Sequence, residues 1–236
     1  MLWLDFETFN TRDITVGTYA YAETAEVLIA TYAFDDGPVL TWDATRDPIL
    51  PADLRQYLQP GTGPITAHNA VFDRNILRSA LGIETDIPRW TCTMTQAMAH
   101  GFPGGLSMLG KLLKLPDDRA KIKDGRRLIL KFCKPAPTNH NADRYTRETS
   151  PDDWQLFLEY AAQDVDAMRE VAKRLPSWNW GPEMLAGYHL DQKINDRGFA
   201  VDMELVRAGA VAADAEKIRL GNRFRELTGG QVSAPT

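Results

Sequence analysis

The sequence has few cysteines and no long apolar run. Only two of its 236 residues are cysteines, and Cys92 and Cys133 lie too far apart to form a zinc-binding pair. We therefore expect two free, buried thiols in a reducing compartment. No apolar run approaches the roughly 18–20 residues that a membrane-spanning helix needs, and Asp5 and Glu7 interrupt the start of the chain, where a secretory signal is apolar. These absences predict a cytoplasmic protein with no membrane partner.

Positive charge is also scarce, because 27 Lys and Arg residues face 32 Asp and Glu residues, giving a net charge of −5. An acidic balance argues against a protein that simply coats nucleic acid. The charge is uneven, however: it is −7 over residues 1–110, +7 over 111–147 and −5 over 148–236. The positive charge of the middle stretch indicates either a solvated helical face or a surface that contacts successive phosphates of a nucleic acid. Its cations are Lys111, Lys114, Arg119, Lys121, Lys123, Arg126, Arg127, Lys131, Lys134, Arg144 and Arg147.

The length and a hydrophobic content of 44% predict one full globular domain with an appendage. Apolar runs bounded by turn residues predict five strands, at 2–7, 27–34, 39–42, 65–69 and 90–93. Helical spacing with proline or glycine boundaries predicts helices at about 51–57, 70–81, 106–115, 126–134, 151–175, 183–196 and 202–227. A further helix is expected directly after the last strand, capped by Thr93 or Thr95. The first three strands follow one another directly, which predicts an antiparallel meander, and the later ones are joined through helices. The order therefore predicts a mixed α/β sheet flanked by helices.

Four acids and one tyrosine stand out by their placement. Asp5 and Glu7 share one face of the first strand, because side chains repeat every two residues. Asp73 begins the helix that follows a buried strand, and Tyr160 and Asp164 are four residues apart on one helix face. Two carboxylates on one strand face repel each other unless a cation lies between them. A hard divalent ion with oxygen ligands, Mg²⁺ or Mn²⁺, fits this pattern.

Each of these residues also has an ordinary structural interpretation. An acidic pair on a strand is often an exposed, solvated face, although the apolar residues around Asp5 and Glu7 favour a central strand. Tyr160 is compatible with a half-buried aromatic side chain whose hydroxyl meets water, and Asp164 with a surface acid. The four histidines show no ligand spacing, and we interpret all of them as structural: His68, His100, His140 and His189.

Three short motifs resemble those of the DEDD superfamily of 3′→5′ exonucleases, in the same order. They are Asp5-Phe6-Glu7, Asn69-Ala70-Val71-Phe72-Asp73 and Tyr160-Ala161-Ala162-Gln163-Asp164. A sibling branch has histidine five residues before the last Asp, where this chain has Glu159. The chain is therefore similar to the tyrosine branch, which includes the proofreading domains of family A DNA polymerases and ribonuclease D-like enzymes. The resemblance implies a ribonuclease H-like fold with a mixed five-stranded sheet and a C-terminal helical extension.

The resemblance extends beyond the motifs. Residues 106–109 and 125–135 are similar to stretches of phage-type family A polymerases, and residues 183–236 resemble the beginning of a polymerase region. We accordingly expect an exonuclease domain over 1–176 and a helical extension over 177–236. Because no palm-like sequence follows, we do not expect this chain alone to polymerise. The expected setting is the cytoplasm of a bacterium or of a phage-infected host.

The resemblance also implies roles for the acidic residues. Two divalent ions, Mg²⁺ or Mn²⁺, would be held by four carboxylates: Asp5 would bridge both, Glu7 and Asp164 would complete the first site, and Asp73 would hold the second ion. Tyr160 would orient the attacking water. Its ordinary pKa of about 10 makes it a poor base at neutral pH. The product would be a 5′-mononucleotide released from a 3′ end.

By the same resemblance, several residues are expected to bind the substrate. Thr8, Asn69 and Phe72 would contact the terminal nucleotide, with Phe72 stacking on it or packing in the core instead. Independently of the resemblance, the positive charge of residues 111–147 indicates a phosphate-binding track that would include Arg126, Arg127 and Lys131. The expected partners are DNA with a single-stranded or frayed 3′ end, and a downstream polymerase domain or replication proteins.

Three functions are compatible with these patterns. The first is a proofreading exonuclease that acts on DNA. The second is a ribonuclease D-like enzyme that trims RNA from the 3′ end, which leaves the polymerase-like tail unexplained. The third is a non-catalytic module that holds DNA in a replication assembly, and the presence of all four acids together with Tyr160 counts against it.

Overall fold

The computed structural model describes residues 1–115, 125–139 and 142–231. The chain divides into two compact units, Met1–Lys193 and Ile194–Thr236. All five strands belong to the first unit, together with the helices from α1 to α7 and most of α8. The functional division into 1–176 and 177–236 stays a prediction.

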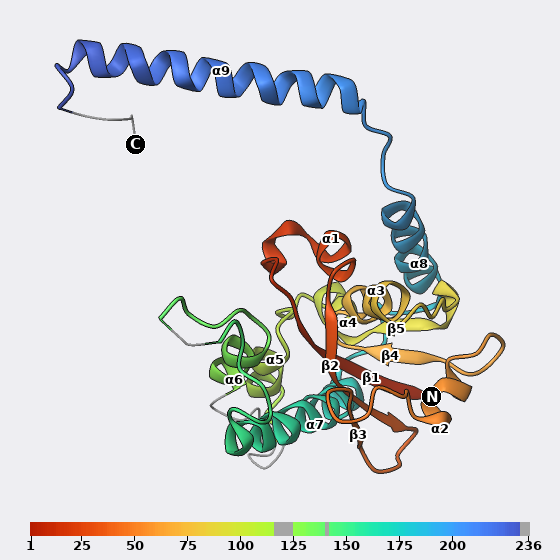
Figure 1. Ribbon diagram of the computed structural model, residues 1–236. Helices are drawn as coiled ribbons and strands as arrows, with labels where there is room; N and C mark the ends of the chain where they lie inside the picture. Colours follow the sequence, from red (N-terminus) through yellow and green to blue (C-terminus); the bar gives the residue numbers. More distant parts are fainter. Residues whose placement is uncertain (116–124, 140–141, 232–236) are drawn as a thin grey trace. The chain divides into compact units, whose positions relative to one another are not determined.

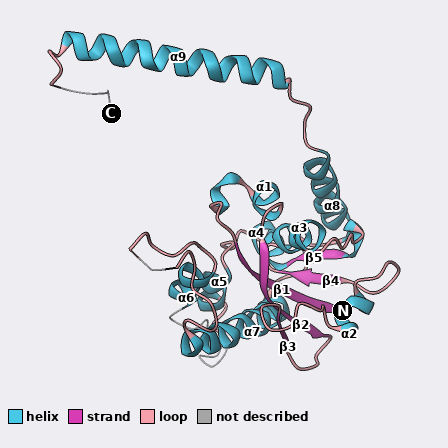
Figure 2. Cartoon of the chain, viewed as in Figure 1, coloured by secondary structure: helices cyan, strands magenta, loops and turns pink. Residues whose placement is uncertain are grey.

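Five strands form one mixed sheet in the order β3-β2-β1-β4-β5 (Figures 1 and 2). Their bounds are β1 Leu2–Phe9, β2 Glu26–Phe34, β3 Leu40–Asp43, β4 Ile65–Ala67 and β5 Trp90–Cys92. The first three strands are antiparallel neighbours, and β4 and β5 run parallel to β1 and to each other. This arrangement confirms the predicted meander and the predicted mixed five-stranded sheet, and it places β1 at the centre.

One face of the sheet is apolar. Leu2 and Leu4 are fully buried and Phe6 is 4% exposed, because alternate residues of β1 point to the same side. They pack in one core cluster with apolar side chains of α2 (Ala52–Tyr57) and α3 (Ala70–Ala80). Burial of these side chains is the main stabilising contribution on this face, at about 25 cal/mol per Å² of apolar area.

The long helix α7 (Pro151–Arg174) covers the other face against β1 and β2. Its apolar residues recur at spacings of three and four, and the buried set includes Phe157, Ala161 and Val165. The hydroxyl of Thr31 on β2 donates a hydrogen bond to the carbonyl of Ala161 at 3.0 Å, which fixes α7 to the sheet in the middle of the helix. Asp5 and Glu7 belong to this face.

The remaining helices follow the predicted order, with one addition. They are α1 Thr18–Ala22, α4 Thr93–Ala99, α5 Leu106–Leu112, α6 Gly125–Phe132, α8 Pro182–Arg197 and α9 Met203–Leu227, with short 3-10 turns at Ile14–Val16 and Ile87–Arg89. The helix α1 and the turn before it were not predicted, because five residues carry no helical periodicity. Within the described ranges, every helix is too short or too polar to cross a lipid bilayer.

Candidate active site

The central strand β1 presents two carboxylates on the face that α7 covers. Asp5 is half-buried and Glu7 is 9% exposed. Directly after Glu7 the pairing with β2 shifts by one residue, because Glu7 pairs with Ile29 and Thr8 with Val27. Such a bulge increases the local twist of a strand and changes the direction of nearby side chains. The irregularity therefore lies at the position where the strand delivers its second acid.

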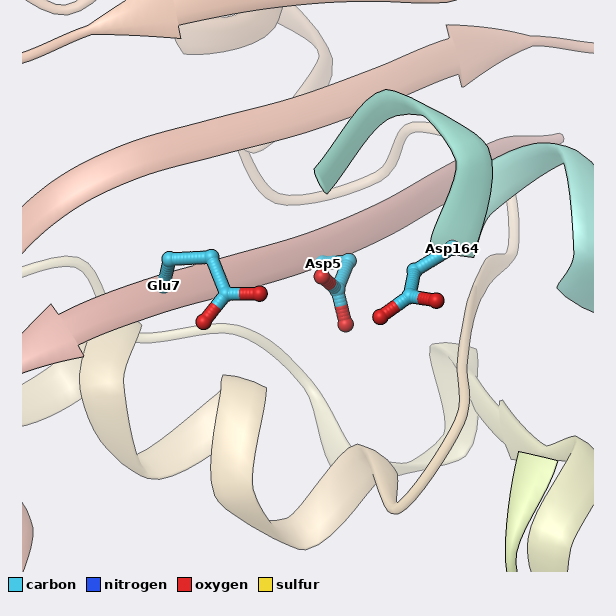
Figure 3. A group of neighbouring side chains, drawn as sticks. All are labelled: Asp5, Glu7 and Asp164. Carbon is cyan, nitrogen blue, oxygen red and sulfur yellow. The ribbon is translucent and has the colours of Figure 1, made fainter. Parts of the chain in front are cut away.

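The third carboxylate comes from α7. Asp164 is 7% exposed, and its side chain points from the helix toward the two acids of β1. One oxygen from each of Asp5, Glu7 and Asp164 lies within 4.8 Å of the others, with Asp5 in the middle (Figure 3). The structure thus brings together three of the four predicted ligands. In the sequence, Asp164 follows Asp5 by 159 residues and Glu7 by 157 residues.

Asp73 reaches β1 from a different element, α3. One of its carboxylate oxygens accepts a hydrogen bond from the backbone N–H of Phe6 at 3.1 Å. That N–H is available because the pairing of β1 with β4 ends at Trp3 and Thr66. Asp73 is 1% exposed, and burial together with the neighbouring Asp5 charge raises the pKa of its carboxyl well above the ordinary range.

Tyr160 lies one helical turn before Asp164 and is completely buried. Its ring stacks on Phe157, with centroids 6.2 Å apart and an interplanar angle of 11°. Its hydroxyl lies close enough to Asp164, four residues further along the same helix face, for the two groups to interact. Burial raises the pKa of the Tyr160 phenol above its usual value, and the charges of Asp164, Glu7 and Asp5 raise it further. The tyrosine and the three clustered carboxylates therefore share one site.

The donor set of this cluster suits a hard divalent cation. All its ligand atoms are carboxylate oxygens, which Mg²⁺ and Mn²⁺ prefer. Three carboxylates within 4.8 Å also repel one another, and a cation between them removes that repulsion. Asp5, Glu7 and Asp164 are thus the residues that could hold a metal ion, with Asp73 close to them through its contact with β1.

A cavity of about 210 Å³ lies beside Glu7 and is mostly apolar. Thr8 and Phe72 both line it, as expected for residues that contact a terminal nucleotide, and their direct role stays a prediction. Tyr21 completes one wall: its hydroxyl lies 3.0 Å from that of Thr8, and its ring lies 5.9 Å from that of Phe72. Tyr21 belongs to the unpredicted helix α1, so the sequence offered no signal that would place it here.

Phe72 and Asn69 were both predicted to contact the terminal nucleotide. Phe72 also packs against the main core cluster, which agrees with the packing interpretation, and its contact with a nucleotide stays a prediction. Asn69, the residue before α3, is exposed and has a left-handed backbone with a φ of 69°. Asparagine tolerates this conformation better than most residues. The position makes the sharp turn from β4 into α3, and its predicted contact with substrate stays a prediction.

Several cations of the basic stretch, residues 111–147, form ion pairs with acidic residues from outside it. Asp153 accepts a bidentate pair from Arg127, at 2.9 and 3.0 Å, and a further bond from Lys131 at 2.6 Å. The two cations hold the pKa of Asp153 at about 2. Lys134 pairs with Asp13, and Arg144 with Glu26, so the net charge of the stretch overstates its unneutralised positive charge. Arg119, Lys121 and Lys123 lie outside the described residues.

Arg126, by contrast, is exposed on α6 and makes no ion pair with the described residues. The charges of its neighbours Arg127 and Lys131 are partly neutralised, because both side chains form ion pairs with Asp153. All three contacts with phosphate stay predictions, and Arg126 is the cation among them that is best placed to make one.

The histidines and cysteines described by the structure have the structural roles that we expected. Both ring nitrogens of His68 are engaged, by Thr93 at 2.8 Å and by the carbonyl of Gly104 at 2.7 Å. His100 and His189 are likewise bound to backbone groups, and His140 lies outside the described residues. Both cysteines are free and buried. The thiol of Cys133 donates to Glu7 at 3.8 Å, a contact that the sequence did not indicate.

No protein-family model matches the chain. Two similar solved structures are those of Brucella melitensis NrnC bound to pGG and of the same protein with bound Mg²⁺. The first is 14% identical, has a TM-score of 0.50, and matches over 81% of this chain and 79% of its own. The second is 15% identical, also has a TM-score of 0.50, and matches over 86% and 88%. At this level of identity the likeness concerns the fold.

A curated relative adds a sequence relationship. The DNA polymerase of Bacillus phage SP02 is 34% identical over 238 residues, which cover 97% of this chain and 36% of that polymerase. The chain therefore spans about a third of the length of this relative. The sheet topology, the acidic cluster and this relative together confirm the resemblance of the chain to the DEDD-superfamily exonuclease domain of phage DNA polymerases.

Proposed function

We propose that the chain is a metal-dependent 3′→5′ exonuclease that hydrolyses DNA to 5′-mononucleotides and serves as the proofreading part of a DNA polymerase. The single observation that carries this proposal is the cluster of Asp5, Glu7 and Asp164, with Tyr160 buried one helical turn before Asp164. The cluster unites the first and third of the motifs that the sequence shares with exonucleases.

The four acids have the chemistry of a site for two Mg²⁺ or Mn²⁺ ions. Asp5 lies between Glu7 and Asp164 and would be suited to bridge two ions, while Asp73, whose carboxyl lies close enough to Asp5 to respond to its charge, would help to hold the second ion. When bound, two such ions place positive charge on the scissile phosphate and make water a better nucleophile. The four carboxylates would hold the cations, and the burial of Glu7, Asp73 and Asp164 limits the screening of their charge by solvent.

Tyr160 supplies orientation to the attacking water. Burial and the neighbouring carboxylates raise the pKa of the phenol above its ordinary value of about 10, so it stays protonated at neutral pH and its hydroxyl acts as a hydrogen-bond donor or acceptor and not as a base. The stack on Phe157 holds the ring in one position. A fixed hydroxyl is effective because placing a reacting group in advance removes part of the entropic barrier.

The cavity beside Glu7 fits the terminal nucleotide. Its aromatic wall of Phe72 and Tyr21 is suited to contact a base or sugar, and Thr8 offers a hydroxyl next to the acids. Stacking on aromatic side chains tolerates every base, as an enzyme that removes any mismatched nucleotide requires. The exposed Arg126 is suited to bind a phosphate of the approaching strand.

The preference for DNA rests on the relative that is a DNA polymerase. Residues 1–176 would then be the exonuclease domain, and residues 177–236 the helical start of a polymerase region. The partners would be a frayed DNA primer end and a polymerase domain or replication proteins, in the cytoplasm of a bacterium or of a phage-infected host.

A substrate panel tests the proposal. End-labelled single-stranded DNA, mismatched duplex DNA and single-stranded RNA are each incubated with Mg²⁺, with Mn²⁺ or with a chelator. We expect metal-dependent shortening of both DNA substrates and weaker shortening of RNA. A clear preference for RNA would favour the ribonuclease D-like alternative. Binding of DNA without any shortening would favour the non-catalytic alternative, and either result would overturn the proposal.

A further inference from the structure

The first residue of α6, Gly125, is buried and lies directly against the ring of Tyr160. A Cβ atom at Gly125 would lie 2.1 Å from Cε2, 2.7 Å from Cδ2 and 2.9 Å from Cζ of that ring. Carbon atoms attract one another at about 3.5–4.0 Å and repel strongly at such shorter distances. Only a residue without a side chain fits between α6 and Tyr160 as they stand.

The ring has little freedom to move away from such an atom. On α7 it stacks on Phe157, which in turn stacks on Phe132 of α6 at 5.3 Å between centroids. Leu128 and Phe132 of α6 and Ala161 of α7 belong to the same buried cluster, and α6 lies beside α7 (Figure 1). Tightly packed side chains transmit a displacement to their neighbours. A larger residue at 125 must therefore shift either α6 or the tyrosine.

The hydroxyl end of the same ring lies beside the acidic cluster, because Tyr160 and Asp164 are buried one turn apart on the same face of α7 and the charges of the three carboxylates act on the phenol. We propose that Gly125 is a positioning residue for catalysis: its lack of a side chain lets α6 hold the Tyr160 ring against Phe157, with the hydroxyl beside the carboxylates. The inference rests on the proposed exonuclease function, because it assigns the hydroxyl of Tyr160 a role in the reaction. The glycine acts through Tyr160 and touches neither substrate nor metal itself.

Gly125 differs from the other helical glycines of the chain in this contact. At Gly187 in α8 and at Gly209 and Gly221 in α9, an added Cβ would meet nothing within 4 Å. Gly187→Ala is therefore a matched control, since it makes the same substitution in an exposed helical position of the first compact unit. It reports any general effect of replacing a helical glycine with alanine.

A double-mutant cycle tests the proposal on single-stranded DNA with Mn²⁺. Gly125→Ala and Tyr160→Phe are compared singly and together, and kcat and KM are measured for each. We expect Gly125→Ala to lower kcat by about 10²-fold while KM changes little. In the Tyr160→Phe background, which keeps the ring but lacks the hydroxyl, the same substitution should lower kcat by no more than about twofold. Gly187→Ala should leave both constants unchanged.

Two outcomes would overturn the proposal. One is an equal loss of kcat on adding Gly125→Ala to the wild type and to Tyr160→Phe, since a purely structural defect acts in both backgrounds. The other is a Gly125→Ala protein with wild-type kcat. Failure of Gly125→Ala to fold would also contradict the proposal, because the glycine would then serve packing alone.

Melting temperatures measure the contact independently of activity. Gly125→Ala should lower the Tm of the wild type but not that of Tyr160→Ala, where no ring meets the new methyl group. An equal loss in both would show that the contact with the ring is absent. A wild-type chain that does not shorten DNA would defeat the proposed function and the catalytic role of Gly125, while these melting temperatures would still test the packing.

Discussion

The side chain of Asp73 is hydrogen-bonded to the backbone of Phe6, whose N–H lies 3.1 Å from a carboxylate oxygen. This bond ties α3 to the central strand between Asp5 and Glu7. It gives the buried acid two separate duties, because the oxygen that accepts the N–H stabilises the fold while the negative charge serves the site. Two substitutions separate these duties.

Asp73→Asn and Asp73→Ala should differ in stability but not in activity. The amide oxygen of Asn can still accept the Phe6 N–H, so we expect a metal-free Tm no lower than that of the wild type. Alanine leaves the N–H without its acceptor and should cost about 1–3 kcal/mol in the free energy of unfolding. Both should lose most hydrolysis. Equal unfolding free energies for the two variants, from urea titrations, would contradict the structural duty.

Metal binding should stabilise the folded chain. A ligand at about 100 times its dissociation constant adds about 2.7 kcal/mol, which raises the Tm of a chain this size by about 5–10 °C. Asp164→Asn removes one of the three clustered carboxylates and should abolish most of this increase. Asp166→Asn, two residues further along α7, is the control and should retain it. Thermal unfolding with and without Mg²⁺ measures the difference, and equal shifts in both variants would place the ion elsewhere.

Tyr160→Phe should separate chemistry from binding. The ring and its stack on Phe157 remain, and only the hydroxyl and its interaction with Asp164 are lost. We expect kcat to fall by about 10²-fold, with unchanged affinity for single-stranded DNA and a stability loss of about 1 kcal/mol. Tyr188→Phe, at another buried tyrosine, is the matched control. Unfolding of Tyr160→Phe would show instead that the hydroxyl serves packing.

Arg126 and Arg127 should respond differently to substitution. Arg126 is exposed, whereas Arg127 forms a bidentate pair with Asp153. Arg126→Ala should reduce the slope of log affinity for DNA against log salt by about 1, as expected for one lost phosphate contact. Arg127→Ala should change the slope less. Fluorescence anisotropy over a range of salt concentrations measures both slopes, and an unchanged slope for Arg126→Ala would refute the contact.

The sequence was informative wherever a local pattern determines the structure. Alternation in residues 2–7 predicted both the central strand and the common face of Asp5 and Glu7, because the pleat repeats every two residues. The spacing of Tyr160 and Asp164 likewise predicted one helix face, since one turn separates them. Ordered motifs then indicated that these distant segments meet at one site.

Other features depend on contacts between segments that no local pattern reveals. Tyr21 lies in a five-residue helix without periodicity, and only the folded chain places it beside Thr8. The pairing of Arg127 with Asp153 spans 26 residues, so counting charges along the basic stretch missed it. In the sequence Gly125 is only the boundary of a predicted helix. Its close approach to the ring of Tyr160 is visible only in the folded chain.

The most direct test of the account follows the direction of hydrolysis and its dependence on the acidic cluster. A single-stranded DNA labelled at its 5′ end is incubated with Mn²⁺ and either the wild-type chain, Asp5→Asn or Asp164→Asn. The account predicts a ladder of labelled products that shorten from the 3′ end, with 5′-mononucleotides released, and no ladder with either variant although both remain folded. Immediate release of a labelled mononucleotide, or a wild-type ladder from a folded Asp5→Asn chain, would contradict it.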